Sequence, residues 1–294
     1  MAQFDLDGVT AIVTGGSRGI GPHIAAALAE HGARVALIAR SRRELEAVAR
    51  DARRAGHEAI AVAADVTSHE DRHAIVETVQ RELGPIDVLV NNAGGDPQRR
   101  FHNLGEDDIE AVLSLNLTSA VILARLVLPG MLARGRGHIV NVSSMAGRTS
   151  FPHTEAYAAA KDGLIGFTRV LRGDYRALGV SASAVILGPV GGEGVGARTA
   201  QEFGLTLPRF IATPRAVARA TVRAIVADRA EITVVPGPGR TLRAVMDRFP
   251  AAGPALNRLT GTDKTMDTVA EHRERQALPR DARPMIEKPP PVPN

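Results

Sequence analysis

The sequence predicts a doubly wound α/β fold, in which a parallel sheet is covered by helices on both faces. Short apolar runs rich in β-branched residues alternate with longer segments of helical periodicity over most of the chain. The runs are apolar throughout, which is typical of parallel strands buried on both faces. A glycine-rich turn, TGGSRGIG, joins the first run to the first helical segment. Together these features indicate a Rossmann-type, three-layer α/β/α domain.

The elements follow in chain order, and glycines and a proline mark several of their ends. Pro22 fits the first turn of a helix, where its missing N–H costs nothing, and Gly32, Gly56 and Gly84 each follow a helical segment. We expect strands at Thr10–Thr14, Arg34–Ala39, Ala59–Ala64, Asp87–Asn91, His138–Ser143, Ser181–Leu187 and Glu231–Pro236. We expect helices at Pro22–His31, Arg42–Ala55, His69–Leu83, Asp107–Arg134, Tyr157–Leu178 and Pro214–Ala227.

The C-terminal part departs from this alternation. Residues Gly188–Phe210 are rich in glycine and are expected to be irregular. Residues Arg240–Leu259 predict one or two short amphipathic helices broken at their two prolines, and the Pro-rich end is expected to be disordered. We therefore divide the chain into a single Rossmann domain, 1–239, and a C-terminal helical extension, 240–294.

Composition and charge exclude several classes of function. The net charge of +4 is small for 294 residues, and no basic run is interleaved with aromatic residues, which argues against nucleic-acid binding. The chain has no cysteine and so offers no disulfide, thiolate ligand or cysteine nucleophile, and we expect no metal site. The N-terminus does not resemble a secretory signal, and the apolar run Ala120–Leu132 is too short to span a bilayer. We expect a cytoplasmic protein without a membrane span.

The glycine-rich turn predicts a dinucleotide site. Gly15, Gly19 and Gly21 lie where a strand turns into a helix, so that a pyrophosphate can approach the backbone and the free N–H groups of the helix N-terminus. Glycines also serve tight turns for steric reasons alone, but this position in the fold favours the dinucleotide. The second strand is followed by Arg40 rather than by an acidic residue, and Arg18 lies in the turn. Unless both are merely solvated, two arginines can neutralise a 2′-phosphate, so we expect NADP in preference to NAD.

A lysine and a tyrosine stand one helical turn apart. Lys161 is the only lysine between Met1 and Asp263, and Tyr157 is one of two tyrosines. At positions i and i+4 their side chains share a helix face. An ammonium beside a phenol favours the phenolate, so we expect Lys161 to lower the pKa of Tyr157 from its usual value of about 10. Tyr157 is then a candidate acid and base, whereas the other tyrosine, Tyr175, has no such companion.

Six motifs in this order resemble those of the classical short-chain dehydrogenase/reductase family, from Leu6 to Gly239. The family patterns are TGxxxGxG, Asp–Val after the third strand, NNAG after the fourth, an Asn in the next helix, a Ser after the fifth strand, and YxxxK. They match Thr14–Gly21, Asp65–Val66, Asn91–Gly94, Asn116, Ser144, and Tyr157 with Lys161. Ser144 is chosen over Ser143 because it has the family's usual separation from the tyrosine.

The resemblance implies a catalytic tetrad and a set of cofactor contacts. Tyr157 would act as acid and base, and Lys161 would lower its pKa and bind the nicotinamide ribose. Ser144 would hold the substrate oxygen, and Asn116 would support a proton relay. The implied cofactor-binding residues are Gly15, Ser17, Arg18, Gly19, Ile20, Gly21, Arg40, Asp65, Val66, Asn92, Ala93, Gly94, Tyr157, Lys161, Gly188 and Val190.

The implied activity is that of an NADP(H)-dependent oxidoreductase. It would transfer a hydride between the nicotinamide and a carbonyl or secondary alcohol of a small-molecule substrate, as a ketoreductase does. Two alternatives stay open on the same fold. One is a regulatory protein that senses a dinucleotide, and the other is a non-redox dehydratase or epimerase.

One segment departs from the family pattern. The family usually has Pro-Gly and then a Thr after the sixth strand, whereas this chain reads ILGPVGGEGVG. Leu187 replaces the proline, Gly188 keeps the glycine, and Gly192 replaces the threonine. We expect a weaker grip on the cofactor here, with backbone contacts left to Val190, and a mobile substrate lid at 191–210.

The resemblance also implies a homo-oligomer. Segments Asp107–Arg134 and Tyr157–Leu178 resemble the helices through which family members dimerise, so a homodimer or homotetramer is expected. Three roles of the extension stay open: it could cover the active-site mouth, pack on a neighbouring subunit or touch a membrane surface. Of these, a packed lid or dimer element is favoured.

Overall fold

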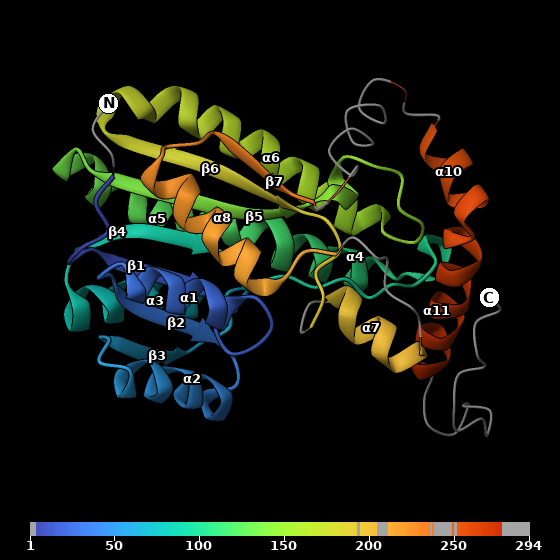
Figure 1. Cartoon of the computed structure of the whole chain (residues 1–294), viewed down its shortest axis with the longest axis horizontal. Coiled ribbons are helices and arrows are strands. Elements are labelled where there is room, and N and C mark those ends of the chain that lie inside the picture. Colours follow the sequence, from blue (N-terminus) through green and yellow to red (C-terminus); the bar gives the residue numbers. More distant parts are fainter. Residues whose placement is uncertain are drawn as a thin grey trace.

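Seven parallel strands form one sheet in the computed structural model, in the order β3-β2-β1-β4-β5-β6-β7 (Figure 1). The structure describes residues 4–192, 195–204, 211–235, 237, 249 and 252–277. The strands are β1 (Thr10–Thr14), β2 (Arg34–Ala39), β3 (Ala59–Ala63), β4 (Ile86–Asn91), β5 (Gly137–Ser144), β6 (Val180–Leu187) and β7 (Glu231–Val234). The helices are α1 (Gly21–Glu30), α2 (Arg42–Arg54), α3 (His69–Leu83), α4 (Glu106–Leu113), α5 (Ser119–Arg134), α6 (Glu155–Tyr175), α7 (Val195–Phe203), α8 (Pro214–Val226), α10 (Ala252–Thr260) and α11 (Thr262–Ala277).

Helices cover both faces of the sheet. Side chains of α1, α2 and α8, such as Ile24 and Val217, are buried against one face. Side chains of α3, α5 and α6, such as Ile75 and Leu123, are buried against the other. The strand order reverses between β1 and β4, which is the switch point where ligands bind in sheets of this kind. The predicted Rossmann-type α/β/α fold is confirmed.

The long helix expected at Asp107–Arg134 is divided into α4 and α5 by a π-helical turn, Ser114–Thr118. Within this turn the Asn116 amide donates from Nδ2 to the Val112 carbonyl at 2.9 Å, so a side chain competes for a carbonyl of the helix ladder. A π-turn of this type often marks a functional position in a helix.

Two further predictions on the C-terminal side were wrong. The stretch expected to be irregular, Gly188–Phe210, contains the helix α7. Pro254 does not break a helix but lies in the first turn of α10, where the helix has no use for its N–H. The helix α11 was not predicted, although Met266, Val269 and Ala270 form its buried face. The predicted Pro-rich disordered tail lies outside the described residues.

A buried polar chain connects the sheet to α6. Asn91 on β4 donates from Nδ2 to Asn141 Oδ1 on β5 at 2.8 Å, and Asn141 Nδ2 donates to Thr168 Oγ1 on α6 at 2.8 Å. All three side chains are almost fully buried. Because a buried polar group is costly unless it is paired, these bonds fix the position of α6 over β5.

One helical stretch, Glu106–Arg134, is long and apolar enough to cross a membrane by length and composition alone. In the fold this stretch is α4, the π-turn and α5. Leu123, Val127 and Met131 are buried against the sheet, as expected for a core helix.

Candidate active site

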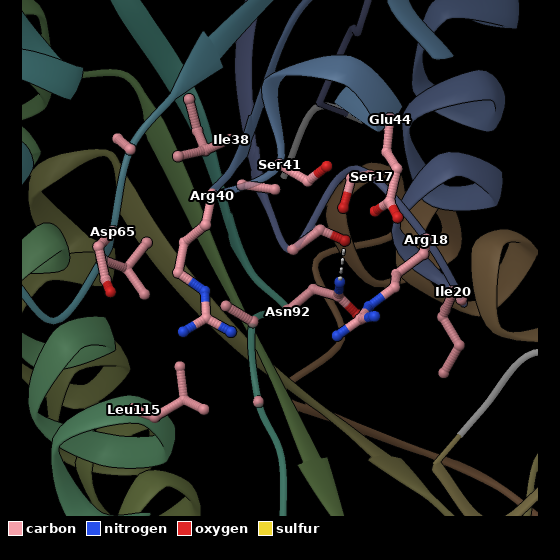
Figure 2. A pocket seen from close by; sticks show the side chains of 17 residues that line it. Ser17, Arg18, Ile20, Ile38, Arg40, Ser41, Glu44, Asp65, Asn92 and Leu115 are labelled. Carbon is pink, nitrogen blue, oxygen red and sulfur yellow. Dashed lines mark hydrogen bonds between the residues drawn. The ribbon is translucent and has the colours of Figure 1, made fainter. Parts of the chain in front are cut away.

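A cavity of about 400 Å³ opens at the carboxyl ends of β1, β2 and β4, within the usual size range of small-ligand sites. Figure 2 shows side chains that line it. Eleven of the predicted cofactor-binding residues contribute to this lining: Gly15, Ser17, Arg18, Gly19, Ile20, Arg40, Asp65, Val66, Asn92, Ala93 and Gly94. The structure thus brings the glycine turn, the end of β2, the Asp–Val pair and the NNAG segment to one cavity.

The glycine turn is held against the NNAG segment by Thr14, the last residue of β1. Its Oγ1 accepts hydrogen bonds from the backbone N–H of Asn92 at 2.9 Å and of Ala93 at 3.0 Å. The Asn92 side chain returns a bond from Nδ2 to the Thr14 carbonyl at 2.9 Å. A Cβ on Gly21 would lie 2.0 Å from the Gly15 carbonyl oxygen, so only glycine permits this tight turn. The N-terminus of α1 therefore faces the cavity, where its N–H groups can bind phosphate.

Arg18 and Arg40 extend into the same cavity from two different segments (Figure 2). Among the described residues, neither guanidinium forms an ion pair with a carboxylate. Asp65 lies near Arg40. Although burial of its carboxyl raises the pKa, hydrogen bonds from Thr67 and the charge of Arg40 lower it more. The acidic residue that lines this cavity on the β2 side is Glu44, within the first turn of α2 rather than at the strand end. The cavity thus offers two free cations where a 2′-phosphate would lie.

Tyr157 and Ser144 come together at the end of β5. Ser144 is the last residue of β5, and its hydroxyl lies close enough to the phenol of Tyr157 on α6 to lower the pKa of that phenol. The neighbouring Ser143 is buried instead, and its hydroxyl donates to the Lys161 carbonyl at 2.8 Å. The alternation of side chains along β5 therefore directs one serine to the tyrosine and the other to the backbone of α6.

Lys161 is 4% exposed and lies beneath the tyrosine. Its Nζ donates to the Val142 carbonyl at 3.0 Å and lies 5.6 Å from the centroid of the Tyr157 ring. A Cβ on Gly94 would lie 3.3 Å from this Nζ and 2.7 Å from Asn116 Oδ1. Gly94 thus lets the cavity lining approach both the lysine and the asparagine.

Asn116 is 1% exposed and faces the backbone next to Gly94. Its Oδ1 accepts a bond from the Gly95 N–H at 3.1 Å, and its Nδ2 donates to the Gly95 carbonyl at 2.8 Å. The four predicted catalytic residues therefore lie on β5, α6 and the π-turn, around the segment that also lines the cavity.

The net shift of the Tyr157 pKa is opposite to the expected one. Burial raises the pKa of Tyr157 to about 12. The nearby Ser144 hydroxyl lowers it in part, and the charge of Asp96 raises it further. Burial also lowers the pKa of Lys161, to about 8. The predicted direction was wrong because sequence spacing shows the neighbouring cation but not the loss of water around the phenol.

Asp96 is a charged residue of the site that the motifs did not reveal. It follows Gly94 and Gly95, and its Oδ1 accepts a bond from the Gln98 N–H at 3.3 Å. Burial and the charge of Glu155 raise the pKa of Asp96 to about 6, against that hydrogen bond. Its carboxyl lies close enough to the tyrosine to act on the phenol. The only signal in the sequence was its place two residues after the NNAG motif.

Other predicted positions lie outside the cavity lining, namely Gly21, Tyr157, Lys161, Gly188 and Val190. Val190 is buried and forms an isolated parallel β-bridge with Ala212. In this bridge the Gly191 N–H donates to the Ala212 carbonyl, and the Ala212 N–H donates to the Pro189 carbonyl. The Val190 N–H and C=O therefore point away from that bridge. The family's threonine is replaced by Gly192, whose φ of 80° is unfavourable for a β-branched residue.

Six lining residues were not predicted as cofactor contacts: Ile38, Ala39, Ser41, Glu44, Ala64 and Leu115. Most of them flank the carboxyl ends of β2 and β3. Because ligands bind outside these ends in doubly wound sheets, the predicted strand bounds carried enough information to find them.

The fold and the site define a dinucleotide-dependent oxidoreductase acting on CH–OH or C=O groups. The chain belongs to the short chain dehydrogenase family, whose model matches residues 9–203.

Relatives and a solved structure agree with this membership. Ketoacyl reductase HetN of Nostoc sp. is 38% identical over 79% of this chain and 80% of its own. The 3-oxoacyl-[acyl-carrier-protein] reductase FabG of Vibrio cholerae is 36% identical over 63% of this chain and 75% of its own. A metagenomic short-chain oxidoreductase, solved in complex with NADP, is 34% identical and superimposes with a TM-score of 0.68, covering 79% of this chain and 99% of its own.

Proposed function

We propose that this chain is an NADP(H)-dependent ketoreductase in which Tyr157 exchanges the proton. The observation that carries the proposal is the pair of hydroxyls of Ser144 and Tyr157, which lie close together at the end of β5 with the buried Lys161 beside the tyrosine ring. The nearby cavity, with Arg18 and Arg40, supports NADP as the cofactor. The ketoacyl reductases among the relatives support a carbonyl as the substrate group.

In the proposed reaction the substrate oxygen lies between the two hydroxyls. NADPH, when bound, supplies the hydride. Ser144 donates a hydrogen bond that holds the oxygen and stabilises its developing charge. Tyr157 transfers its phenolic proton to that oxygen.

The remaining two residues support this transfer. Lys161 places a cation beneath the phenol and stabilises the phenolate left after the transfer. Asn116 holds the Gly94–Gly95 backbone beside that lysine through two hydrogen bonds. Together they keep the proton donor and its cation at fixed positions, which is the main requirement of acid catalysis.

A carbonyl and alcohol panel with NADPH and with NADH tests the proposal. It includes acetoacetyl-CoA as a 3-oxoacyl thioester, along with unfunctionalised ketones. We expect NADPH consumption with a 3-oxoacyl or related ketone, at higher kcat/KM than with NADH. NADPH binding without turnover of any carbonyl would support a dinucleotide-sensing protein instead, and substrate conversion without a change in NADPH would support a dehydratase or epimerase.

We further propose a cytoplasmic homodimer or homotetramer, built from a catalytic domain at 1–239 and an extension at 240–294. On α6, Val170 is 63% exposed, and Phe167 is half-buried beside α5. These apolar side chains support an interface through α5 and α6. Light scattering at micromolar concentration tests it, since a monomer there would contradict the proposed assembly.

A further inference from the structure

The helix α11 lies outside the part of the chain that the family model matches, yet it reaches the active site. It stands with α10 beside α7, at the end of the sheet where the strands end (Figure 1). Two loops flank the catalytic residues at this end. The β4 loop (residues 92–104) carries Gly94 and Asp96, and the β5 loop (residues 145–154) joins Ser144 to α6.

The β4 loop is attached to α11 through Arg100. Its Nη1 lies 3.1 Å from Glu274 Oε2, and its Nη2 lies 2.9 Å from Glu271 Oε1. The Arg100 backbone N–H donates to Glu274 Oε1 at 2.9 Å. One carboxylate thus binds both the backbone and the side chain of Arg100, and such charge-assisted bonds are among the stronger ones in proteins.

The β5 loop is attached to the same helix through His153. Its Nε2 lies 2.8 Å from Asp267 Oδ1. His153 has a φ of 58°, a left-handed conformation that non-glycine residues adopt at a cost unless the surroundings hold it. The contact with α11 therefore fixes the chain four residues before Tyr157.

The helix α7 is the third segment fixed by α11. Phe203 is buried with Met266 and Val269. Its ring packs edge-to-face with that of His272, with 4.9 Å between the ring centroids. Glu202 forms an ion pair with Arg273 at 2.6 Å. The other side of α7 reaches the β4 loop, where Thr199 donates to Gln98 Oε1 at 2.7 Å.

We propose that α11 is a clamp within the same chain that fixes the two catalytic loops, and that Arg100 and His153 are positioning residues for the reaction. Asp267, Glu271 and Glu274 provide the fixed side of this clamp. The clamp acts on the substrate side of the site, because the segments that it holds carry Asp96 and lead to Tyr157. The cofactor cavity is lined mostly by the glycine turn and by the carboxyl ends of β2 and β3. The β4 loop contributes only residues 92–94, which are distant in the chain from Arg100, so we expect the clamp to leave cofactor binding unchanged. The effect on turnover rests on the proposed ketoreductase function.

Three variants test the clamp: Arg100→Gln, Glu274→Ala and their combination. The control is Lys264→Gln, since Lys264 is an exposed cation on the same helix that forms no ion pair within the described part of the chain. Hydrogen exchange of residues 95–104 and 146–154 is measured first, because it needs no substrate. We expect exchange of the Arg100 amide to rise about tenfold in Glu274→Ala, where its acceptor is lost, and to stay unchanged in the control.

Turnover and cofactor binding give the second readout. With acetoacetyl-CoA we expect KM to rise about tenfold in Glu274→Ala, while the Kd of NADPH stays within about twofold. The double variant should be only slightly worse than Glu274→Ala, because, of the contacts between Arg100 and α11, only the bond to Glu271 remains to be lost. Arg100→Lys, which keeps the charge but loses the planar fork, should fall between wild type and Arg100→Gln.

The histidine arm of the clamp has its own test. His153→Asn keeps a residue that tolerates the left-handed conformation but no longer reaches Asp267. We expect faster exchange in residues 146–154 and a higher KM, with unchanged NADPH affinity.

Several results would overturn the clamp. They are unchanged exchange in Glu274→Ala, equal effects in Lys264→Gln, or a loss of NADPH affinity at unchanged KM. If wild type reduced no carbonyl of the panel, the proposed function would fail, and the exchange measurements alone would decide on the clamp.

Discussion

The proton of Tyr157 is the single-residue property on which the proposed reaction depends. Burial raises its pKa to about 12, so the phenol carries its proton at neutral pH and can donate it. We expect Tyr157→Phe to lower kcat/KM for reduction by about 10²- to 10⁴-fold, the usual contribution of a positioned acid. Tyr175→Phe, at the C-terminal end of the same helix, is the matched control and should keep the wild-type rate. Full turnover in Tyr157→Phe would show that another group supplies the proton.

Asp96 adds to the rise of the Tyr157 pKa that burial causes, so we expect it to affect the pH at which the proposed base works. Its negative charge raises the pKa of Tyr157, and its own pKa is about 6. Alcohol oxidation needs the phenolate, so we expect Asp96→Asn to shift the alkaline rise of the oxidation rate to lower pH. Below pH 6 Asp96 is itself protonated, and the two enzymes should converge. Asp162→Asn, on the exposed side of α6, should leave the profile in place; an unshifted profile in Asp96→Asn would contradict the role of this charge.

Arg40 is the residue on which we expect the choice of cofactor to depend. Its guanidinium is exposed in the cavity, and a 2′-phosphate would form charge-assisted hydrogen bonds with it. We expect Arg40→Ala to raise the Kd of NADPH about tenfold or more and to change that of NADH little. The control is Arg43→Ala, which replaces an exposed arginine at the second position of α2. Equal losses for both cofactors, measured by fluorescence titration, would remove Arg40 from phosphate recognition.

At the scale of elements, those with local end signals were predictable, and those that depend on distant contacts were not. The helix α3 has the predicted bounds because Ser68 caps its first turn and Gly84 follows its last. The helix α7 was missed because its burial depends on Phe203 meeting α11, which lies far along the chain. The π-turn was missed because it depends on Asn116 bonding to Val112 and Gly95 rather than on helical periodicity.

The site divides in the same way. The motif spacing placed Ser144 near Tyr157, and the fold brings their hydroxyls together. The sign of the pKa shift of Tyr157 could not be predicted from the sequence, because it depends on burial and on Asp96. The attachment of Arg100 to α11 could not be predicted either, since the sequence of a helix does not indicate which residues its acidic side chains will bind.

At the scale of the whole molecule, one buried histidine couples folding to pH. His138 on β5 is 1% exposed, and its Nε2 lies 2.8 Å from the Ser183 hydroxyl on β6. Burial lowers the pKa of His138 to about 4; Asp228 opposes this shift, and Arg172 adds to it. The unfolded chain therefore binds a proton between about pH 6.5 and pH 4 that the folded protein does not. Stability is lost as the pH falls through this window.

We expect His138 to reduce the free energy of unfolding by about 2 kcal/mol between pH 7.5 and pH 5. Asp228 does not contribute in this window. Although its partial burial raises its pKa, the bonds from Arg172, Ser181 and Arg176 lower it far below the usual value, so its stabilising contribution is lost only in stronger acid.

Urea unfolding of His138→Gln at pH 7.5, 6 and 5 isolates the contribution of the histidine. The variant should be less stable than wild type at pH 7.5 but should lose less stability on acidification. His102→Gln, at an exposed loop position, should keep the wild-type pH dependence, and an unchanged dependence in His138→Gln would assign the acid sensitivity to other groups.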